Sequence, residues 1–263
     1  MVRGFLVDCC FLFRGFSLAC QFRRQEPPEQ CVPRLEPRNE DDSLPTLNAA
    51  CLMQRTVTLS LQGLLKLLTC VLICKVVIAV LLSYRDYMPP NFAEDFLQGR
   101  ERYFYGSYQW AFYVHITSGP CALILGMILL SEQFRRWYPF WHRCLGRIQV
   151  ACVLLLVAPS GLWMAWYAHA GIVAETGFAA LAVATGTCVA LGWRSAVRRR
   201  FVEHRRWMSR CFALLFSAVV LRFIGGLATV AGFDSEWLYP LAAWTSWMLP
   251  LTTLEVCRMR RWE

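Results

Sequence analysis

Two histidine-arginine pairs carry the clearest chemical pattern in this sequence of 263 residues. His142-Arg143 lies in Phe-Trp-His-Arg-Cys-Leu-Gly-Arg, and His204-Arg205 lies in Glu-His-Arg-Arg-Trp-Met-Ser-Arg. We expect each pair on the first turn of a helix, where the helix N-terminus and the neighbouring arginines keep the imidazole neutral. Two neutral imidazoles from separate helices can ligate a haem iron. His142 and His204 are therefore candidate haem ligands, with capping or anchoring at a membrane interface as the alternative.

A further arginine follows each pair about one and a half helical turns later. Arg147 and Arg210 are candidate contacts for haem propionates or another anion, and haem b is the candidate cofactor. Arg210 also has an alternative structural partner in Glu255, which the predicted threading of the chain places at a similar level.

A second group of polar residues falls inside apolar stretches. His115 is followed by Ser118-Gly119-Pro120, and the proline should kink a helix and free a backbone carbonyl. Similar weak points are expected at Pro159-Ser160-Gly161, Gly225-Gly226 and Pro250 in other stretches. Arg222 lies about fifteen residues into another stretch, where an unpaired guanidinium costs about 2.5–3.5 kcal/mol. We expect an outer polar site that holds an anionic group and is made of His115, Arg222, Tyr113 and Ser118. The alternatives are close packing of small residues, and an Arg222 that snorkels to the surface or binds helix carbonyls.

Other kinds of chemistry lack their usual motifs. The thirteen cysteines include no C-x-x-C pair, so the spacings indicate no zinc or iron–sulfur site. The sequence contains no Walker loop, G-x-S-x-G or H-E-x-x-H motif, which removes the usual basis for a hydrolase or a nucleotide-driven pump. The fourth histidine, His169, ends an apolar stretch, and we expect an interfacial histidine there.

Six long apolar stretches position these residues. Hydrophobic residues make up 57% of the chain and charged residues only 17%. Each stretch approaches or exceeds the ~20 residues that a helix needs to cross a bilayer. The sequence therefore predicts an all-α, polytopic transmembrane helix bundle with six spans, at about 64–84, 109–131, 147–169, 177–193, 207–230 and 238–257.

Arginine-rich and arginine-poor connections alternate between the stretches. The connections after the second and fourth stretches and the tail after the sixth are rich in arginine, and such loops stay on the cytoplasmic side. Both termini are therefore predicted to lie inside. The net charge is +9, and most of the basic residues lie in the loops that determine this topology. We therefore expect the lipid bilayer, and no nucleic acid, as the partner.

Residues 1–52 differ from the rest, because a cysteine-rich opening precedes a proline- and charge-rich run. We expect this extension to be disordered or loosely bound to a surface. The alternative is that Met53 is the true start of the native protein. Residues 53–263 form the predicted transmembrane domain.

From about Trp110 to Arg261 the chain resembles a bacterial family of multi-spanning membrane proteins of unknown function. The resemblance depends on His115 before Ser-Gly-Pro, on His142-Arg143 with Leu-Gly-Arg, on His204-Arg205-Arg206-Trp-Met, and on Leu221-Arg222. It implies a helical protein of the bacterial inner membrane without an assigned activity. A looser likeness to b-type di-haem membrane cytochromes comes from histidines near both faces. Two classes of function stay open, a haem-binding redox protein and a transporter or small-ligand-binding bundle. A non-catalytic role as an assembly or structural subunit is a third alternative.

Overall fold

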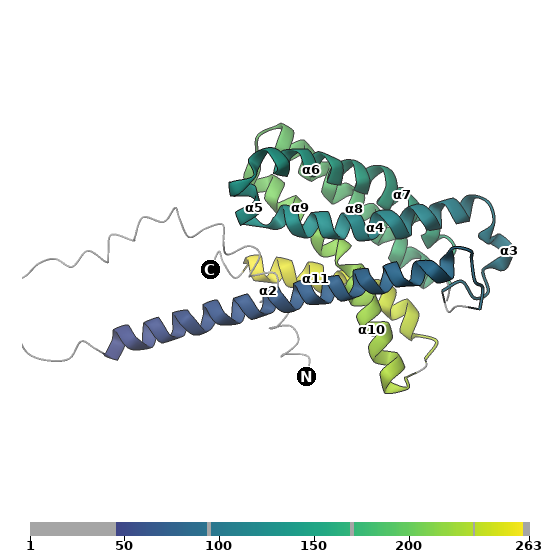
Figure 1. Ribbon diagram of the computed structural model, residues 1–263, viewed down its shortest axis with the longest axis horizontal. Coiled ribbons are helices and arrows are strands. Elements are labelled where there is room, and N and C mark those ends of the chain that lie inside the picture. The colour runs from purple at the N-terminus through teal and green to yellow at the C-terminus, as the bar shows by residue number, and fades with distance from the viewer. Residues whose placement is uncertain (1–45, 94–95, 169–170, 234, 260–263) are drawn as a thin grey trace, which may run out of the picture. The chain divides into compact units, whose positions relative to one another are not determined.

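The computed structural model describes residues 46–93, 96–168, 171–233 and 235–259, and every regular element in them is helical (Figure 1). The chain divides into two compact units, 1–70 and 71–263. The helices are α2 (Thr46–Tyr87), α3 (Glu101–Phe104), α4 (Ser107–Leu130), α5 (Glu132–Trp137), α6 (Pro139–Cys152), the π-helix η2 (Val153–Val157), α7 (Ala158–Ala165), α8 (Ile172–Val197), α9 (Phe201–Leu215), α10 (Ser217–Ala231) and α11 (Leu238–Met259). The predicted all-α class is confirmed.

Five helical segments of the described residues are long and apolar enough to cross a membrane: Leu67–Tyr87, Ser107–Leu130, Pro139–Ala165, Ile172–Val197 and Phe201–Ala231. They overlap the first five predicted spans, and the third begins at Pro139, eight residues before its predicted start at residue 147. The sixth predicted span corresponds to α11, whose 22 residues measure about 33 Å along a helix axis. Its composition is less apolar because it carries Ser246, Thr253 and Glu255. The extension predicted over residues 1–52 lies mostly outside the described residues, since α2 begins at Thr46.

The third span is one rod of three segments, α6, η2 and α7, that follow each other directly. The π-helix η2 ends two residues before Pro159, which lies in the first turn of α7. Proline has no amide hydrogen and its ring collides with the preceding turn, so a locally wider helix relieves that clash. The weak point that Pro159-Ser160-Gly161 predicts is therefore a π segment within a continuous helix.

The fifth span differs from its prediction in one respect. The sequence predicts one helix over residues 207–230, whereas the structure has α9 and α10, which meet at Phe216. No proline or glycine marks this break, and the predicted weak point at Gly225-Gly226 lies inside α10. From the break onward, α10 packs mainly against α11 (Figure 1).

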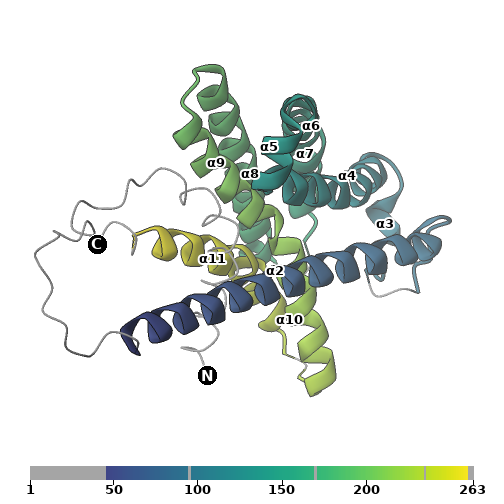
Figure 2. The same ribbon diagram turned by 60° about the vertical axis from the view of Figure 1, so that its left-hand side comes forward.

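Helix α8 is central to the second unit, because it contacts η2, α7, α9 and α11 (Figure 2). Glycines allow the helices to approach closely where they cross. A Cβ atom on Gly126 of α4 would lie 2.9 Å from the Phe212 ring of α9, and one on Gly177 of α8 would lie 3.0 Å from Nε1 of Trp244. Small residues at such crossings are typical of helices packed inside a bilayer.

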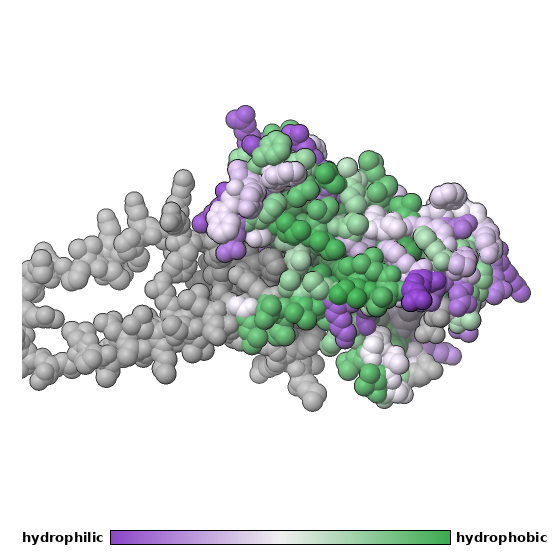
Figure 3. Space-filling view, in the orientation of Figure 1, coloured by the Kyte–Doolittle hydropathy of each residue, from purple (hydrophilic) through white to green (hydrophobic). Residues whose placement is uncertain are grey.

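Apolar side chains dominate the outer surface of the span helices in the face seen in Figure 3. Leu155, Leu227 and Val230 are examples of large apolar residues that face outward. Tryptophans near the span ends are exposed as well, among them Trp110, Trp137, Trp166 and Trp237. An apolar belt with tryptophans at its borders is the surface that a bilayer requires.

A hydrophobic cluster, mostly of aromatic residues, lies at the end of α4 that follows α3. Its buried members are Leu97, Phe104, Tyr108 and Phe112. The guanidinium carbon of Arg100 lies 4.4 Å above the Phe96 ring, so this nearly buried cation is placed on an aromatic face. The cluster ties the loop between α2 and α4 to α4.

Candidate functional site

The first candidate site lies where α9 begins. His204 is on the first turn of α9, as predicted, and its Nδ1 atom lies 2.8 Å from the carbonyl oxygen of Gly192 in α8. The close contact depends on Gly192, because a Cβ atom there would lie 2.8 Å from Sδ of Met208 and 3.4 Å from Cβ of Trp207. The glycine thus brings the α8 backbone within reach of the imidazole.

This contact determines the tautomer of His204. A carbonyl oxygen only accepts hydrogen bonds, so Nδ1 carries the proton and donates it. In the neutral ring the lone pair is then on Nε2, which is the arrangement of most histidines that ligate a metal. His204 is therefore held in an orientation suited to ligation through Nε2.

His142 lies on the first turn of α6, also as predicted, and is half-buried. It is close enough to His204 and Arg135 to interact with both electrostatically. Its Nδ1 atom is buried and has no hydrogen-bond partner among the described residues. A buried nitrogen without a partner is uncommon and is unfavourable unless another group satisfies it. The structure therefore places the two candidate ligands in one neighbourhood, with one nitrogen unsatisfied.

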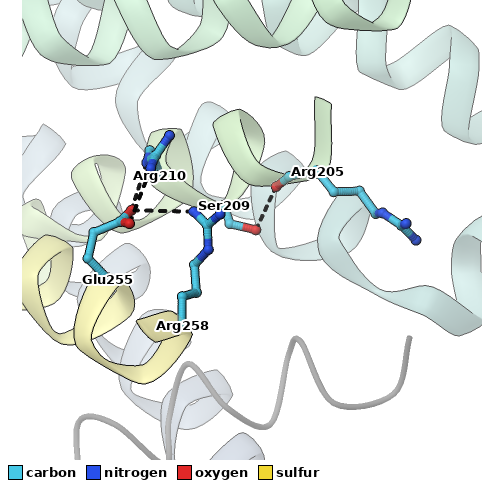
Figure 4. Close-up of polar contacts among 5 residues, drawn as sticks. All are labelled: Arg205, Ser209, Arg210, Glu255 and Arg258. Carbon is cyan, nitrogen blue, oxygen red and sulfur yellow. Dashed lines mark hydrogen bonds and ion pairs between the residues drawn. The ribbon is translucent and has the colours of Figure 1, made fainter. Parts of the chain in front are cut away.

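The two arginines expected near this site behave differently. Arg147 of α6 is exposed. Arg210 of α9 instead donates to both carboxylate oxygens of Glu255 in α11, from Nε at 2.7 Å and from Nη2 at 3.1 Å (Figure 4). Arg258 approaches the same carboxylate at 3.5 Å, and the Arg210 guanidinium carbon lies 4.6 Å above the Trp207 ring. Arg210 thus pairs with Glu255, the structural partner that the sequence analysis gives as the alternative to a propionate contact.

The second candidate site surrounds His115 in α4. Its Nδ1 atom lies 3.1 Å from Oγ of Ser160 in α7. The Ser160 hydroxyl donates to the Leu156 carbonyl oxygen at 2.5 Å, so it accepts a hydrogen bond from His115. A Cβ atom on Gly161 would lie 3.1 Å from Cε1 of His115, and the imidazole also has a backbone contact at Val157. His115 is thus packed against the π segment of the third span.

Arg222 extends from α10 toward the same region. Its Nη1 atom donates to the carbonyl oxygen of Ala218 at 3.2 Å, and the residue is exposed in the absence of lipid. Its charge is within electrostatic reach of His115, Tyr84 and Tyr87. Arg222 therefore binds a carbonyl of its own helix, which is one of the alternatives drawn from the sequence. Its charge is also close enough to His115 to act on it.

The other two expected members of the outer site use their hydroxyl groups elsewhere. Tyr113 donates to the carbonyl oxygen of Tyr87 at 2.8 Å. Ser118 donates to the Val114 carbonyl oxygen of its own helix at 2.6 Å. These hydroxyls stabilise backbone carbonyls and are not directed at Arg222.

Three residues that make contacts between the helices were not identified from the sequence. Ser160 and Gly192 act through contacts between helices, which no local pattern reveals. Gln149 is buried between α6 and α4, where Nε2 donates to the Ala122 carbonyl oxygen at 2.9 Å and Oε1 has no partner among the described residues. An amide inside an apolar stretch is a visible signal, and it could have identified Gln149.

A comparison with known proteins identifies the family of the chain. No curated protein and no solved structure matches the chain. A family model described as "Predicted membrane protein (DUF2306)" matches residues 112–256, a range that contains every candidate residue of both sites. This range is more than half of the 263 residues. The chain is therefore an integral, multi-pass helical membrane protein that belongs to the DUF2306 family of predicted membrane proteins.

Proposed function

We propose that the protein is a redox-active membrane protein that holds a b-type haem between His142 and His204. The supporting observation is the pair itself: His204 has its Nε2 lone pair free, and His142 lies nearby with a buried, unsatisfied nitrogen. Imidazoles are ligands that would hold a haem iron, and the hydrogen bond of His204 leaves its Nε2 atom available for that role. When bound, a haem with two imidazole ligands supplies one-electron transfer.

The protein's own residues have definite roles in this proposal. Gly192 holds the Nδ1 proton of His204, which fixes the ring and raises the basicity of Nε2. The exposed Arg147 is the candidate contact for a propionate. The Arg210–Glu255 pair joins α9 to α11 and so keeps the first turns of α9 in place. We further propose that the protein lies in the bacterial inner membrane with both termini and this site on the cytoplasmic side.

An absorption spectrum of the purified full-length protein tests this function. We expect a Soret band that shifts on reduction, and we expect it to be lost in His142→Ala and in His204→Ala. Cys144→Ala is the matched control, because Cys144 is an exposed free cysteine two residues from His142 on α6. A folded protein that stays colourless after supply of haem during expression would rule the proposal out.

A second candidate function is the binding of a small anion at the outer site. Its support is the proximity of the Arg222 charge to His115, next to a π segment of the kind that often accompanies functional sites. Thermal unfolding during titration with acetate or inorganic phosphate tests it. We expect stabilisation of the native protein and none in Arg222→Leu. Equal responses of the two proteins would remove this candidate.

A further inference from the structure

The turn between α8 and α9 has an arginine where the backbone favours glycine. Helix α8 ends at Val197, and the amide of Arg200 donates to the Ser195 carbonyl oxygen at 2.9 Å. The amide of Arg199 donates to the Ala196 carbonyl oxygen at 3.0 Å. These two bonds form a Schellman motif, in which the residue at the position of Arg199 is left-handed and is usually glycine.

Arg199 adopts that left-handed conformation, with a φ of 57°. Among the described residues it is the single non-glycine residue with a positive φ. A side chain at this position strains the backbone relative to glycine. Backbone geometry therefore does not explain why residue 199 is an arginine, so we look for a role of its side chain.

The turn must lie at a membrane surface. Helices α8 and α9 belong to two successive segments that are long and apolar enough to cross a bilayer, so the three residues that join them are at its boundary. All three are exposed arginines: Arg198, Arg199 and Arg200. Arg200 has a weak pair with Glu203 at 3.6 Å, whereas Arg198 and Arg199 have no ion pair within the described residues.

Apolar side chains flank the arginines on both sides. Val197 is 64% exposed, Phe201 is 61% exposed and Val202 is 56% exposed. Cations beside exposed apolar side chains match a lipid headgroup, which offers a phosphate to the guanidinium groups and acyl chains to the apolar residues. Inorganic phosphate would leave the apolar flank in water.

We propose that the α8–α9 turn, residues 197–202, is a binding site for the phosphate of an anionic phospholipid. Arg198 and Arg199 bind the phosphate, and the exposed Val197, Phe201 and Val202 contact the acyl region below it. The site depends on α8 and α9 crossing the membrane, and it is independent of whether the protein binds haem.

The test measures binding of fluorescent phosphatidylglycerol to the full-length protein in phosphatidylcholine nanodiscs. Arg199→Gly is the decisive variant, because glycine relieves the left-handed strain and the fold is retained. We expect this variant to unfold at the same or a higher temperature and yet to bind phosphatidylglycerol about fivefold more weakly, the effect of about one interfacial arginine. Replacement of both Arg198 and Arg199 by glutamine should weaken binding about thirtyfold.

Arg85→Gln is the control, because Arg85 is an exposed arginine at the end of the first span and outside the turn. We expect it to bind phosphatidylglycerol as the native protein does. Native-level binding in Arg199→Gly would overturn the proposal, and so would an equal loss in Arg85→Gln, which would indicate a general surface charge. Full displacement of the lipid by inorganic phosphate would also overturn it, because the site would then recognise a free anion.

Discussion

His204 keeps its orientation through a glycine on the neighbouring helix. The hydrogen bond from Nδ1 to the Gly192 carbonyl oxygen requires α8 and α9 to pack closely, and the missing Cβ of Gly192 permits that approach. His204 and Gly192 therefore act as a pair, even though twelve positions separate them in the sequence.

The contact between His204 and Gly192 allows the effect of Gly192→Ala to be predicted. The added methyl would collide with Met208 and crowd Trp207, so we expect a loss of about 1–3 kcal/mol in the free energy of unfolding. We also expect a weaker Soret band, because the shifts of Met208 and Trp207 disturb the contact between α8 and α9 that orients His204. Thermal unfolding and absorption spectra check both effects.

Gly186→Ala is the matched control on the same helix. A Cβ atom there would lie 3.5 Å from Cβ of Ala158, which is an ordinary contact. We expect almost no change in unfolding temperature or spectrum. Equal effects of the two substitutions would show that the close approach at Gly192 has no special role.

The Glu255 carboxylate gives a second prediction at this scale. Arg210 makes two hydrogen bonds to it and Arg258 makes one longer contact. Because a two-pronged, charge-assisted contact is the stronger kind, we expect Arg210→Gln to destabilise the protein by about 1–3 kcal/mol. Arg258→Gln should cost less than half as much. Unfolding in detergent measures both, and a larger effect of Arg258→Gln would contradict the geometry.

At the scale of the elements, the proline in α4 frees a carbonyl that another helix uses. Pro120 has no amide hydrogen, so the carbonyl oxygen of Ile116 lacks its usual partner one turn later. The hydroxyl of Tyr84, near the end of α2, donates to that oxygen. The kink expected from the sequence is therefore also a contact between helices.

A double-mutant cycle tests this link. Tyr84→Phe should cost about 1–2 kcal/mol in the native protein, because it leaves the partly buried Ile116 carbonyl without a partner. In the background of Pro120→Ala the same change should cost much less, since residue 120 then supplies the missing amide hydrogen. Equal costs in the two backgrounds would show that Tyr84 and Pro120 act independently.

The positions of the helices could be predicted from the sequence because the bilayer imposes a simple rule. An apolar run of sufficient length must form a helix, so the first five spans fall close to their predicted ranges. The break at Phe216 could not be predicted, since no proline or glycine marks it. The π segment could be predicted only as a weak point near Pro159, because the type of helix depends on the packing around it.

The candidate sites were predicted in part for a related reason. Histidines and arginines inside or beside apolar runs are conspicuous, so His142, His204, His115 and Arg222 could be named as candidates from the sequence. Their orienting partners, Gly192 and Ser160, are small residues that become significant only when two helices meet. His169 lies outside the described residues, and its interfacial position stays a prediction.

At the scale of the whole molecule, the positions of the proposed sites depend on how α8, α9 and α10 cross the bilayer. The segment Phe201–Ala231 is treated as one crossing although it contains the break at Phe216. The predicted threading places the α8–α9 turn on the cytoplasmic side, with His142 and His204 near it. The connection between α10 and α11 then lies on the opposite side.

Epitope-tag accessibility in oriented membrane vesicles measures this threading most directly. One tag is inserted between Arg198 and Arg199, and in a separate protein another is inserted between Gly232 and Phe233. If the segment crosses the bilayer as predicted, the first tag is reached only in inside-out vesicles and the second only in right-side-out vesicles. Detection of both tags from the same side would contradict it, because the segment between them would not cross the membrane.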